Sequence, residues 1–393
     1  MTKLEFDNFY NKAVEMLPVP SSNDKEFRFH FYNKLDSYYD LVVDNKTTLG
    51  FDDNKVKELK DIVKKIKDIL RNEYNGLHST AFASLNNLLG IDDEHDVASR
   101  LIIKRIPALS NKSFYRMRKM ENRKNVPYKE MFHIPFDKRG IISTQRYSFP
   151  GYPCLYLGES IYACWEELGR PLMGESMVSR YVCESELRLV DLRTPRYKDW
   201  KDNIEKYVLF FPIIMACSFK VKSENDTFKP EYIIPQLIME IIIKYNRKAK
   251  DDTYVHGVYY SSVNKNEDFK FGRDKLYNIA VPVIIPLPKE RNRKYCEVLS
   301  GIFKLTVPTC EEFENGKRPL LPTIIKDETQ ASGDHIITDA NERYRNSTYG
   351  LIEERLKDID YFPLHSMDDK TESELEEKRK SVTGRKYKLI SKQ

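Results

Sequence analysis

An arginine, a tyrosine and a glutamate are spaced along one short segment so that they could face a single cleft. Arg146 precedes a Phe-Pro-Gly turn, and a short apolar strand then ends near Tyr156. Ser160 can cap a following helix that carries Glu166 and Glu167 two turns later. Ten positions separate Arg146 from Tyr156, and eleven separate Tyr156 from Glu167. A strand–turn–helix unit of this kind can aim a cation, an aromatic ring and a carboxylate at one site.

This spacing resembles that of the RES domain family, which is named for its Arg, Glu and Ser residues. Two further blocks agree with the family pattern. Tyr232–Gln236 is similar to its Tyr-x-x-Pro-Gln helix start, and Gly257–Val263 is similar to its Ser-bearing strand. Phe114–Arg116 resembles the opening strand and its arginine. The resemblance covers about Leu101 to Leu305, and four blocks in the same order make it fairly specific.

The resemblance implies an ADP-ribosyltransferase-like, α+β fold that binds NAD+ as a substrate, with no metal. Cleavage of the nicotinamide–ribose bond places positive charge on the ribose, much as glycoside cleavage does. A carboxylate that faces this charge stabilises it, and the family spacing assigns that role to Glu167. Glu166 is adjacent, so spacing alone separates the two carboxylates.

The other site residues follow from the same resemblance. Arg146 would hold pyrophosphate oxygens through its guanidinium fork, with Arg116 and Asn278 as further NAD+-binding residues. Tyr156 would clamp the nicotinamide ring, and Ser262 would orient the ribose or the acceptor. Without the family pattern, each residue has an ordinary structural interpretation. Arg146 would be a surface residue, Tyr156 a core residue of a strand, and Arg116 the partner of an acid in the sheet.

The implied function is that of an NAD+-consuming enzyme, acting by phosphorolysis or hydrolysis, with a toxin or defence-like role. Two alternatives remain, a protein ADP-ribosyltransferase and a non-catalytic interaction protein with a RES-like domain. Because unrestrained loss of NAD+ would harm the cell, an antitoxin or inhibitory protein is an expected partner. The sequence has no GxGxxG element, so a Rossmann mode of NAD+ binding is not supported.

The surrounding patterns predict three regions in the 393 residues. Helical periodicity predicts an all-α domain over 1–96, which would regulate the enzyme or bind a partner. Strands and helices then mix without a regular βαβ rhythm, which indicates an α+β catalytic domain over 97–322. Residues 323–393 form a polar, partly mobile extension with one helix over 346–359. The predicted strands of the catalytic domain are 114–117, 154–157, 178–183, 187–192, 255–263 and 279–285, and its predicted helices are 160–168 and 236–245.

The composition is that of a globular protein, with 40% hydrophobic and 32% charged residues. The net charge of +5 is nearly balanced and gives no reason to propose a nucleic-acid partner. None of the six cysteines forms a CxxC pair, so a metal site has no sequence support. Glu5 and Asp7 interrupt any signal peptide, and the apolar run Tyr232–Tyr245 is shorter than the roughly 20 residues of a membrane span. We therefore expect a soluble, cytoplasmic protein without a membrane partner.

Overall fold

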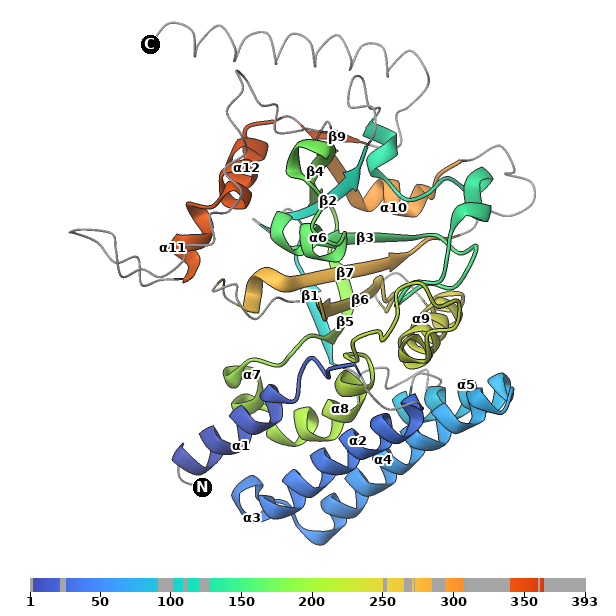
Figure 1. The fold of residues 1–393 in the computed structure, drawn as a ribbon, viewed down its shortest axis with the longest axis vertical. Helices are drawn as coiled ribbons and strands as arrows, with labels where there is room; N and C mark the ends of the chain where they lie inside the picture. The colour runs from blue at the N-terminus through green and yellow to red at the C-terminus, as the bar shows by residue number, and fades with distance from the viewer. Residues whose placement is uncertain are drawn as a thin grey trace, which may run out of the picture.

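The structure, a computed structural model, describes residues 3–21, 26–90, 102–108, 110, 112–120, 128–249, 253–264, 271, 273–284, 294–306, 308, 340–359 and 361–363. Helices in the N-terminal part are followed by a mixed sheet with further helices (Figure 1). The predicted mixture of helices and strands, with an all-helical N-terminal segment, is confirmed.

The described helices are α1 (Lys3–Glu15), α2 (Phe27–Asp44), α3 (Lys46–Leu49), α4 (Asp53–Tyr74), α5 (His78–Leu89), α6 (Ile161–Glu167), α7 (Tyr197–Asp202), α8 (Ile204–Ala216), α9 (Ile233–Asn246), α10 (Glu297–Ile302), α11 (Ala340–Arg345) and α12 (Thr348–Lys357). Short 3-10 helices are η1 (Tyr128–Met131), η2 (Phe136–Ile141), η3 (Met173–Glu175), η4 (Pro230–Tyr232) and η5 (Arg273–Leu276). The strands are β1 (Ile103–Ile106), β2 (Phe114–Lys119), β3 (Cys154–Gly158), β4 (Ser176–Cys183), β5 (Leu187–Leu192), β6 (Gly257–Ser261), β7 (Tyr277–Pro282), β8 (Phe303–Thr306) and β9 (Tyr361–Pro363).

The described strands form one sheet in the order β1-β5-β6-β7-β3-β2-β4-β8-β9. Among the described pairs, β5 and β6 are parallel and the others are antiparallel. The ladder between β2 and β3 contains a single pair, Tyr115 with Gly158. Beyond it β2 continues along β4 and β3 continues along β7. The sheet therefore opens between β2 and β3, in its middle.

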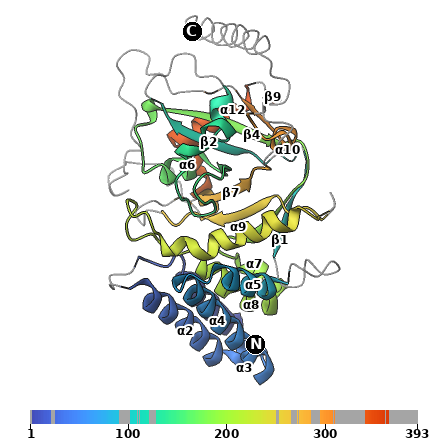
Figure 2. The same ribbon diagram turned by 90° about the vertical axis from the view of Figure 1, so that its right-hand side faces the viewer.

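The N-terminal helices form because their sequences are amphipathic and capped. In α4 the Asp52 side chain accepts the backbone N–H of Lys55 over 2.9 Å, and the buried residues recur at helical spacing. Helix α4 packs against α8 and α9, and α9 packs against β6. Figure 2 shows α9 running between the sheet and the N-terminal helices. One hydrophobic core thus extends from α1–α5 through α8 and α9 to the sheet.

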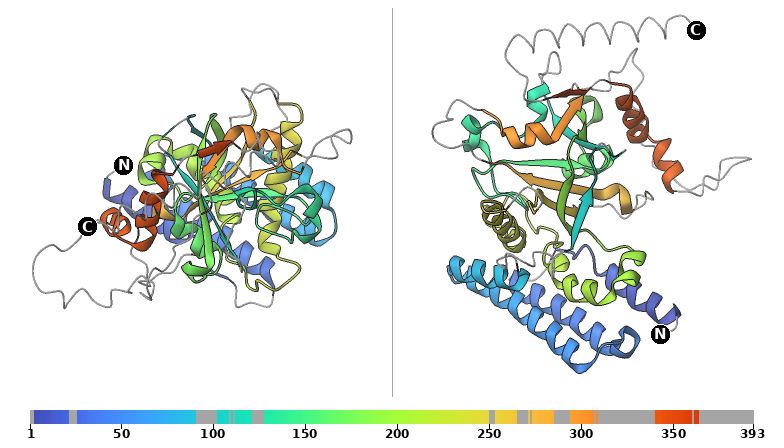
Figure 3. Two further views of the ribbon diagram at one scale, coloured as in Figure 1. Left: turned by 90° about the horizontal axis from the view of Figure 1, so that it is seen from above. Right: turned by 180° about the vertical axis from the view of Figure 1, so that it is seen from behind.

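The described part of the C-terminal extension also packs on the sheet. Strand β9 pairs with β8 at the sheet edge, and α12 contacts α6 and β4. Helices α11 and α12 lie beside the sheet, away from α1–α5 (Figure 3). Tyr344, Tyr349, Ile352 and Leu356 of these helices share a second core with α6 and β2. No helix in the described ranges is both long enough and apolar enough to cross a bilayer.

The shared core predicts that the N-terminal helices and the sheet unfold together. Phe31 of α2 is 1% exposed, whereas Phe29 of the same helix is 62% exposed. We expect Phe31→Ala to lower the free energy of unfolding by about 3–5 kcal/mol. The matched control Phe29→Ala should change it by less than about 0.5 kcal/mol.

Urea unfolding measured by far-UV circular dichroism and by tryptophan fluorescence checks this. The two tryptophans, Trp165 and Trp200, lie in α6 and α7, outside α2–α5, so fluorescence reports on the surroundings of α6 and on the contact of α7 with α1. Both signals should shift together in Phe31→Ala. A shift of the dichroism transition alone would mean that the helices unfold independently of the sheet.

Candidate active site

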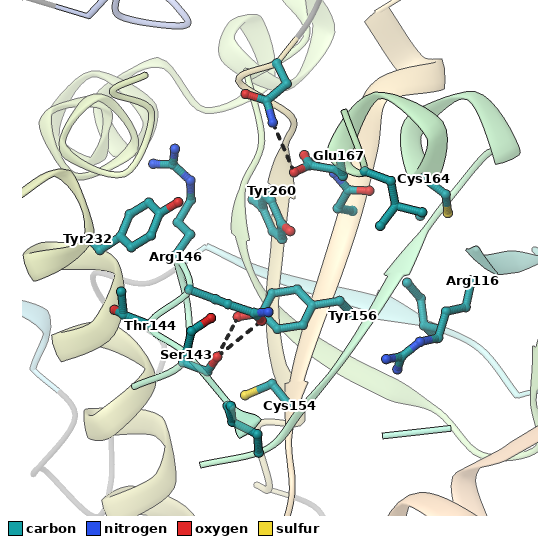
Figure 4. A pocket seen from close by; sticks show the side chains of 18 of the residues that line it. Arg116, Ser143, Thr144, Arg146, Cys154, Tyr156, Cys164, Glu167, Tyr232 and Tyr260 are labelled. Carbon is teal, nitrogen blue, oxygen red and sulfur yellow. Dashed lines mark hydrogen bonds between the residues drawn. The ribbon is translucent and has the colours of Figure 1, made fainter. Parts of the chain in front are cut away.

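A cavity of about 460 Å³ lies where the sheet opens between β2 and β3 (Figure 4). Its lining residues come from β2, β3, β6 and β7, from α6, and from the segments 142–148 and 224–232. Five of the six residues that the sequence singled out line it, Arg116, Arg146, Tyr156, Glu167 and Asn278. The sixth, Ser262, hydrogen-bonds the side chain of Glu167. The structure therefore brings all six together, although they come from separate elements.

Helix α6 carries Glu167 to the cavity. Its start is satisfied by Ser160, whose Oγ accepts the backbone N–H of Ala163 over 2.9 Å, as the sequence predicts. A second acceptor comes from far along the chain, because Glu353 Oε1 of α12 accepts the backbone N–H of Ile161 over 2.8 Å. Tyr344 also donates its hydroxyl to Glu353. The C-terminal helices thus fix the start of the helix that ends in Glu167.

The carboxylate of Glu167 opens into the cavity and is held from three directions. Asn278 Nδ2 donates to Oε1 over 2.9 Å, and Asn264 Nδ2 donates to Oε2 over 3.4 Å. Ser262 forms the third hydrogen bond. The packing of protein around this carboxyl group raises its pKa, while the hydroxyl of Ser262 and the charge of Arg146 oppose the shift. The result is a fixed carboxylate that water and ligands can reach.

Glu166 has a different environment. It is 3% exposed, and Arg170 Nε donates to its Oε2 over 3.0 Å. Glu166 does not line the cavity. The structure therefore separates the two adjacent carboxylates, with Glu167 in the cavity and Glu166 in the wall behind it.

Arg146 is 9% exposed and is anchored by backbone. Its Nη1 donates to Cys217 O over 3.1 Å, and its Nη2 donates to Phe219 O over 2.9 Å. The guanidinium carbon lies 5.1 Å from the ring centroid of Tyr232. Because a guanidinium has five N–H donors, this anchoring leaves others for a ligand.

Gln236 holds the loop that carries Arg146. Its Nε2 donates to Thr144 Oγ1 and Gln145 O, both over 2.9 Å, and to Ser148 O over 3.1 Å. Two residues of the Tyr-x-x-Pro-Gln block therefore hold Arg146 in place. Tyr232 contacts its guanidinium, and Gln236 fixes the backbone of its loop.

Arg116 reaches the cavity from β2, on the side opposite Arg146 (Figure 4). Its Nη1 is buried without a hydrogen-bond partner among the described residues, and no described carboxylate forms an ion pair with it. Burial lowers the pKa of its guanidinium. The acid partner considered from the sequence is not found in the described part of the chain. Such a cation is ready to bind an anion.

Aromatic rings form much of the cavity wall. Tyr156 and Tyr260 lie at its centre, and Tyr232 lies beside Arg146 (Figure 4). The hydroxyl of Tyr156 donates to Ser148 Oγ and accepts the backbone N–H of Tyr147, both over 3.2 Å. These bonds fix the ring so that it can contact a planar ligand group.

The sequence did not indicate Asn264, Tyr260 or Glu353. Tyr260 lies in β6 and Asn264 lies just after it, each two positions from Ser262. Their closeness to this serine in the sequence was the signal that could have indicated them. Glu353 had no local signal, because it lies 192 positions from its partner. Within the described residues, no three His, Cys, Asp or Glu side chains converge as a metal site requires.

Glu353 predicts a pH dependence of stability. Burial raises its pKa from 4.5 to about 7, and its hydrogen bonds with Tyr344 and Ile161 oppose the shift. Between these pH values the folded state keeps a proton that the unfolded state loses, so stability falls as pH rises. We expect Glu353→Gln, which keeps the acceptor oxygen, to remove this loss.

The free energy of unfolding of Glu353→Gln relative to the original chain should therefore rise by up to about 3 kcal/mol from pH 4.5 to pH 8. Urea titrations across this range measure it. Glu354→Gln, at the exposed neighbouring position, is the matched control and should give a flat difference. A flat difference for Glu353→Gln as well would contradict the prediction.

Comparison with known proteins points to one relative. The chain is 29% identical over 320 residues to the protein named "Putative toxin YopC" of Bacillus subtilis (strain 168). The aligned region covers 77% of this chain and 70% of that protein. No protein-family model and no solved structure matches the chain. The resemblance to the RES family therefore rests on the motif residues alone, and the aligned part of the chain is similar to a protein named as a toxin.

Proposed function

We propose that the protein is an enzyme that cleaves the nicotinamide–ribose bond of NAD+ and has a toxin-like role. One observation carries the proposal. A fixed, open carboxylate lies in the same cavity as two guanidinium groups and several tyrosine rings. The cavity volume of about 460 Å³ lies in the range of small-molecule sites.

The two arginines suit the pyrophosphate of NAD+. Arg116 offers a guanidinium whose buried Nη1 has no described partner, and Arg146 retains free donors after its backbone contacts. Guanidinium groups bind phosphate oxygens through charge-assisted hydrogen bonds. Binding an anion would also offset the cost of leaving a charge buried.

Glu167 suits the cleavage step. When the bond between ribose C1′ and the nicotinamide nitrogen breaks, the electron pair leaves with nicotinamide and positive charge develops on the ribose. The ionised Glu167 would stabilise that charge, held by Asn278, Asn264 and Ser262. The ring of Tyr156 would contact nicotinamide. An acceptor oxygen from water, phosphate or a protein then bonds to C1′ and loses its proton to solvent.

The similarity to a protein named as a toxin supports the proposed biological role. NAD+ depletion would harm the producing cell, so an antitoxin or other inhibitory protein is the expected partner. An ADP-ribosyltransferase-like fold belongs to the same proposal, since the motif residues that suggest it also supply the site.

Incubation of the purified full chain with NAD+, with and without phosphate, tests the proposal. Free nicotinamide with ADP-ribose would identify hydrolysis, and nicotinamide with ADP-ribose 1″-phosphate would identify phosphorolysis. A labelled protein band would identify ADP-ribosyl transfer instead. Absence of nicotinamide release under all conditions would favour a non-catalytic interaction protein and reject the proposal.

Glu167→Gln should lower the rate of nicotinamide release by about 10²–10³, because it removes the charge that faces the ribose. The fold should be unchanged, since Gln retains one acceptor. Glu166→Gln is the matched control and should keep turnover at a temperature where it is folded. If Glu166→Gln loses turnover and Glu167→Gln keeps it, Glu166 and not Glu167 is the carboxylate that stabilises the charge.

Arg116→Met should weaken NAD+ binding by roughly 10- to 100-fold, the effect of losing charge-assisted hydrogen bonds. Its stability should stay equal or rise, because the substitution removes a partly buried charge that lacks a described partner. Calorimetric titration and urea unfolding measure the two effects. Arg118→Met, two positions along β2, is the control and should leave NAD+ affinity unchanged, since Arg118 pairs with Glu130 over 3.2 Å outside the cavity. Unchanged affinity in Arg116→Met would remove Arg116 from the site.

A further inference from the structure

Phe219 lies between the N-terminal helices and the cavity. Its backbone carbonyl and that of Cys217 accept the two hydrogen bonds from Arg146, over 2.9 and 3.1 Å. These carbonyls follow the C-terminal end of α8. The direction of the Arg146 guanidinium therefore depends on where residues 217–219 are held.

The linker between α1 and α2 holds this backbone. Val19 N–H donates to Ser218 O over 3.0 Å, and Lys220 N–H donates to Val19 O over 2.9 Å, which forms a short parallel bridge. Leu17 of the same linker and Ser262 line a small second cavity of about 20 Å³. The linker thus contacts the wall beside the serine that bonds Glu167.

Helix α2 holds the side chain of Phe219. The ring is fully buried, and its centroid lies 5.1 Å from that of Phe31, 5.3 Å from that of Phe27 and 5.7 Å from that of His30. Removal of this ring would leave a cavity and loosen the backbone whose carbonyls bind Arg146.

We propose that the N-terminal helices complete the active site, with Phe219 as the positioning residue through which α2 and the α1–α2 linker aim Arg146. The kinetic part of this inference rests on the proposed NAD+ chemistry. The helices would then affect substrate binding through Arg146, in addition to any role in regulation or partner binding.

Kinetics of Phe219→Ala in the full chain test this. The variant should raise KM for NAD+ roughly 10-fold, about the effect of one mispositioned charged hydrogen bond, with a smaller change in kcat. Phe219→Leu, which keeps most of the apolar volume, should restore much of the loss. Phe9→Ala is the matched control, since Phe9 is equally buried but contacts Trp200, and it should leave KM unchanged where the protein is folded. Equal KM effects in Phe9→Ala and Phe219→Ala would overturn the inference.

A double-mutant cycle keeps the test independent of NAD+. The effects of Phe219→Ala and Arg146→Met on the free energy of unfolding should be non-additive, because both disturb the same contact. The effects of Phe9→Ala and Arg146→Met should add. Additivity in the first cycle would overturn the positioning role whether or not the protein cleaves NAD+. An inactive original chain with a non-additive first cycle would instead reject the proposed function alone.

Discussion

Close packing at Gly158 is the constraint on which the site depends. Gly158 ends β3 and pairs with Tyr115 of β2 on one side and with Asn278 of β7 on the other. A Cβ atom there would lie 2.8 Å from Cys164 Sγ and 3.2 Å from Asn278 Oδ1, so a larger residue does not fit without displacing its neighbours. Glycine lets α6 turn back directly over the strand end. This return places Glu167 beside Asn278 at the point where the sheet opens.

The charged side chains around this opening lack, within the described residues, the ion-pair partners that charged side chains elsewhere in the protein have. This difference distinguishes a ligand site from a structural ion-pair network. Arg193 directly follows β5, and Asp191 pairs with it by accepting two hydrogen bonds from its guanidinium. In the cavity, Arg116 has no described partner and Glu167 is held by neutral donors. Unpaired charge lowers stability, so its retention in a cavity is typical of a functional site. Helix α2 contacts Phe219, whose carbonyl binds Arg146, and α12 contacts the start of α6 through Glu353.

Much of the fold could be predicted because local patterns determine it. The strand predicted over 187–192 is β5 without change, and the predicted strands at 114–117 and 154–157 differ from β2 and β3 by one or two residues at one end. Helix α4 lies inside the segment 1–96 that helical periodicity predicts. Helix α8 was not predicted, for two reasons. Its residues are buried on most sides, so the segment shows no amphipathic periodicity, and it contains Pro212, which usually argues against a helix. The sheet order could not be predicted, since it depends on contacts between distant segments.

The sequence by itself determined the spacing of the arginine, tyrosine and glutamate of the site. It also placed Ser160 at the start of the helix that carries the carboxylate. Helix caps and helical spacing depend on a few neighbouring residues, so they can be recognised in a single segment of the sequence. The tertiary structure decided that Glu167 faces the cavity and Glu166 its wall, and that Arg116 is left without a described partner. It also decided that Glu353 supports α6 across 192 positions. Side-chain surroundings of this kind arise only when distant segments pack, because no local pattern specifies which groups will meet.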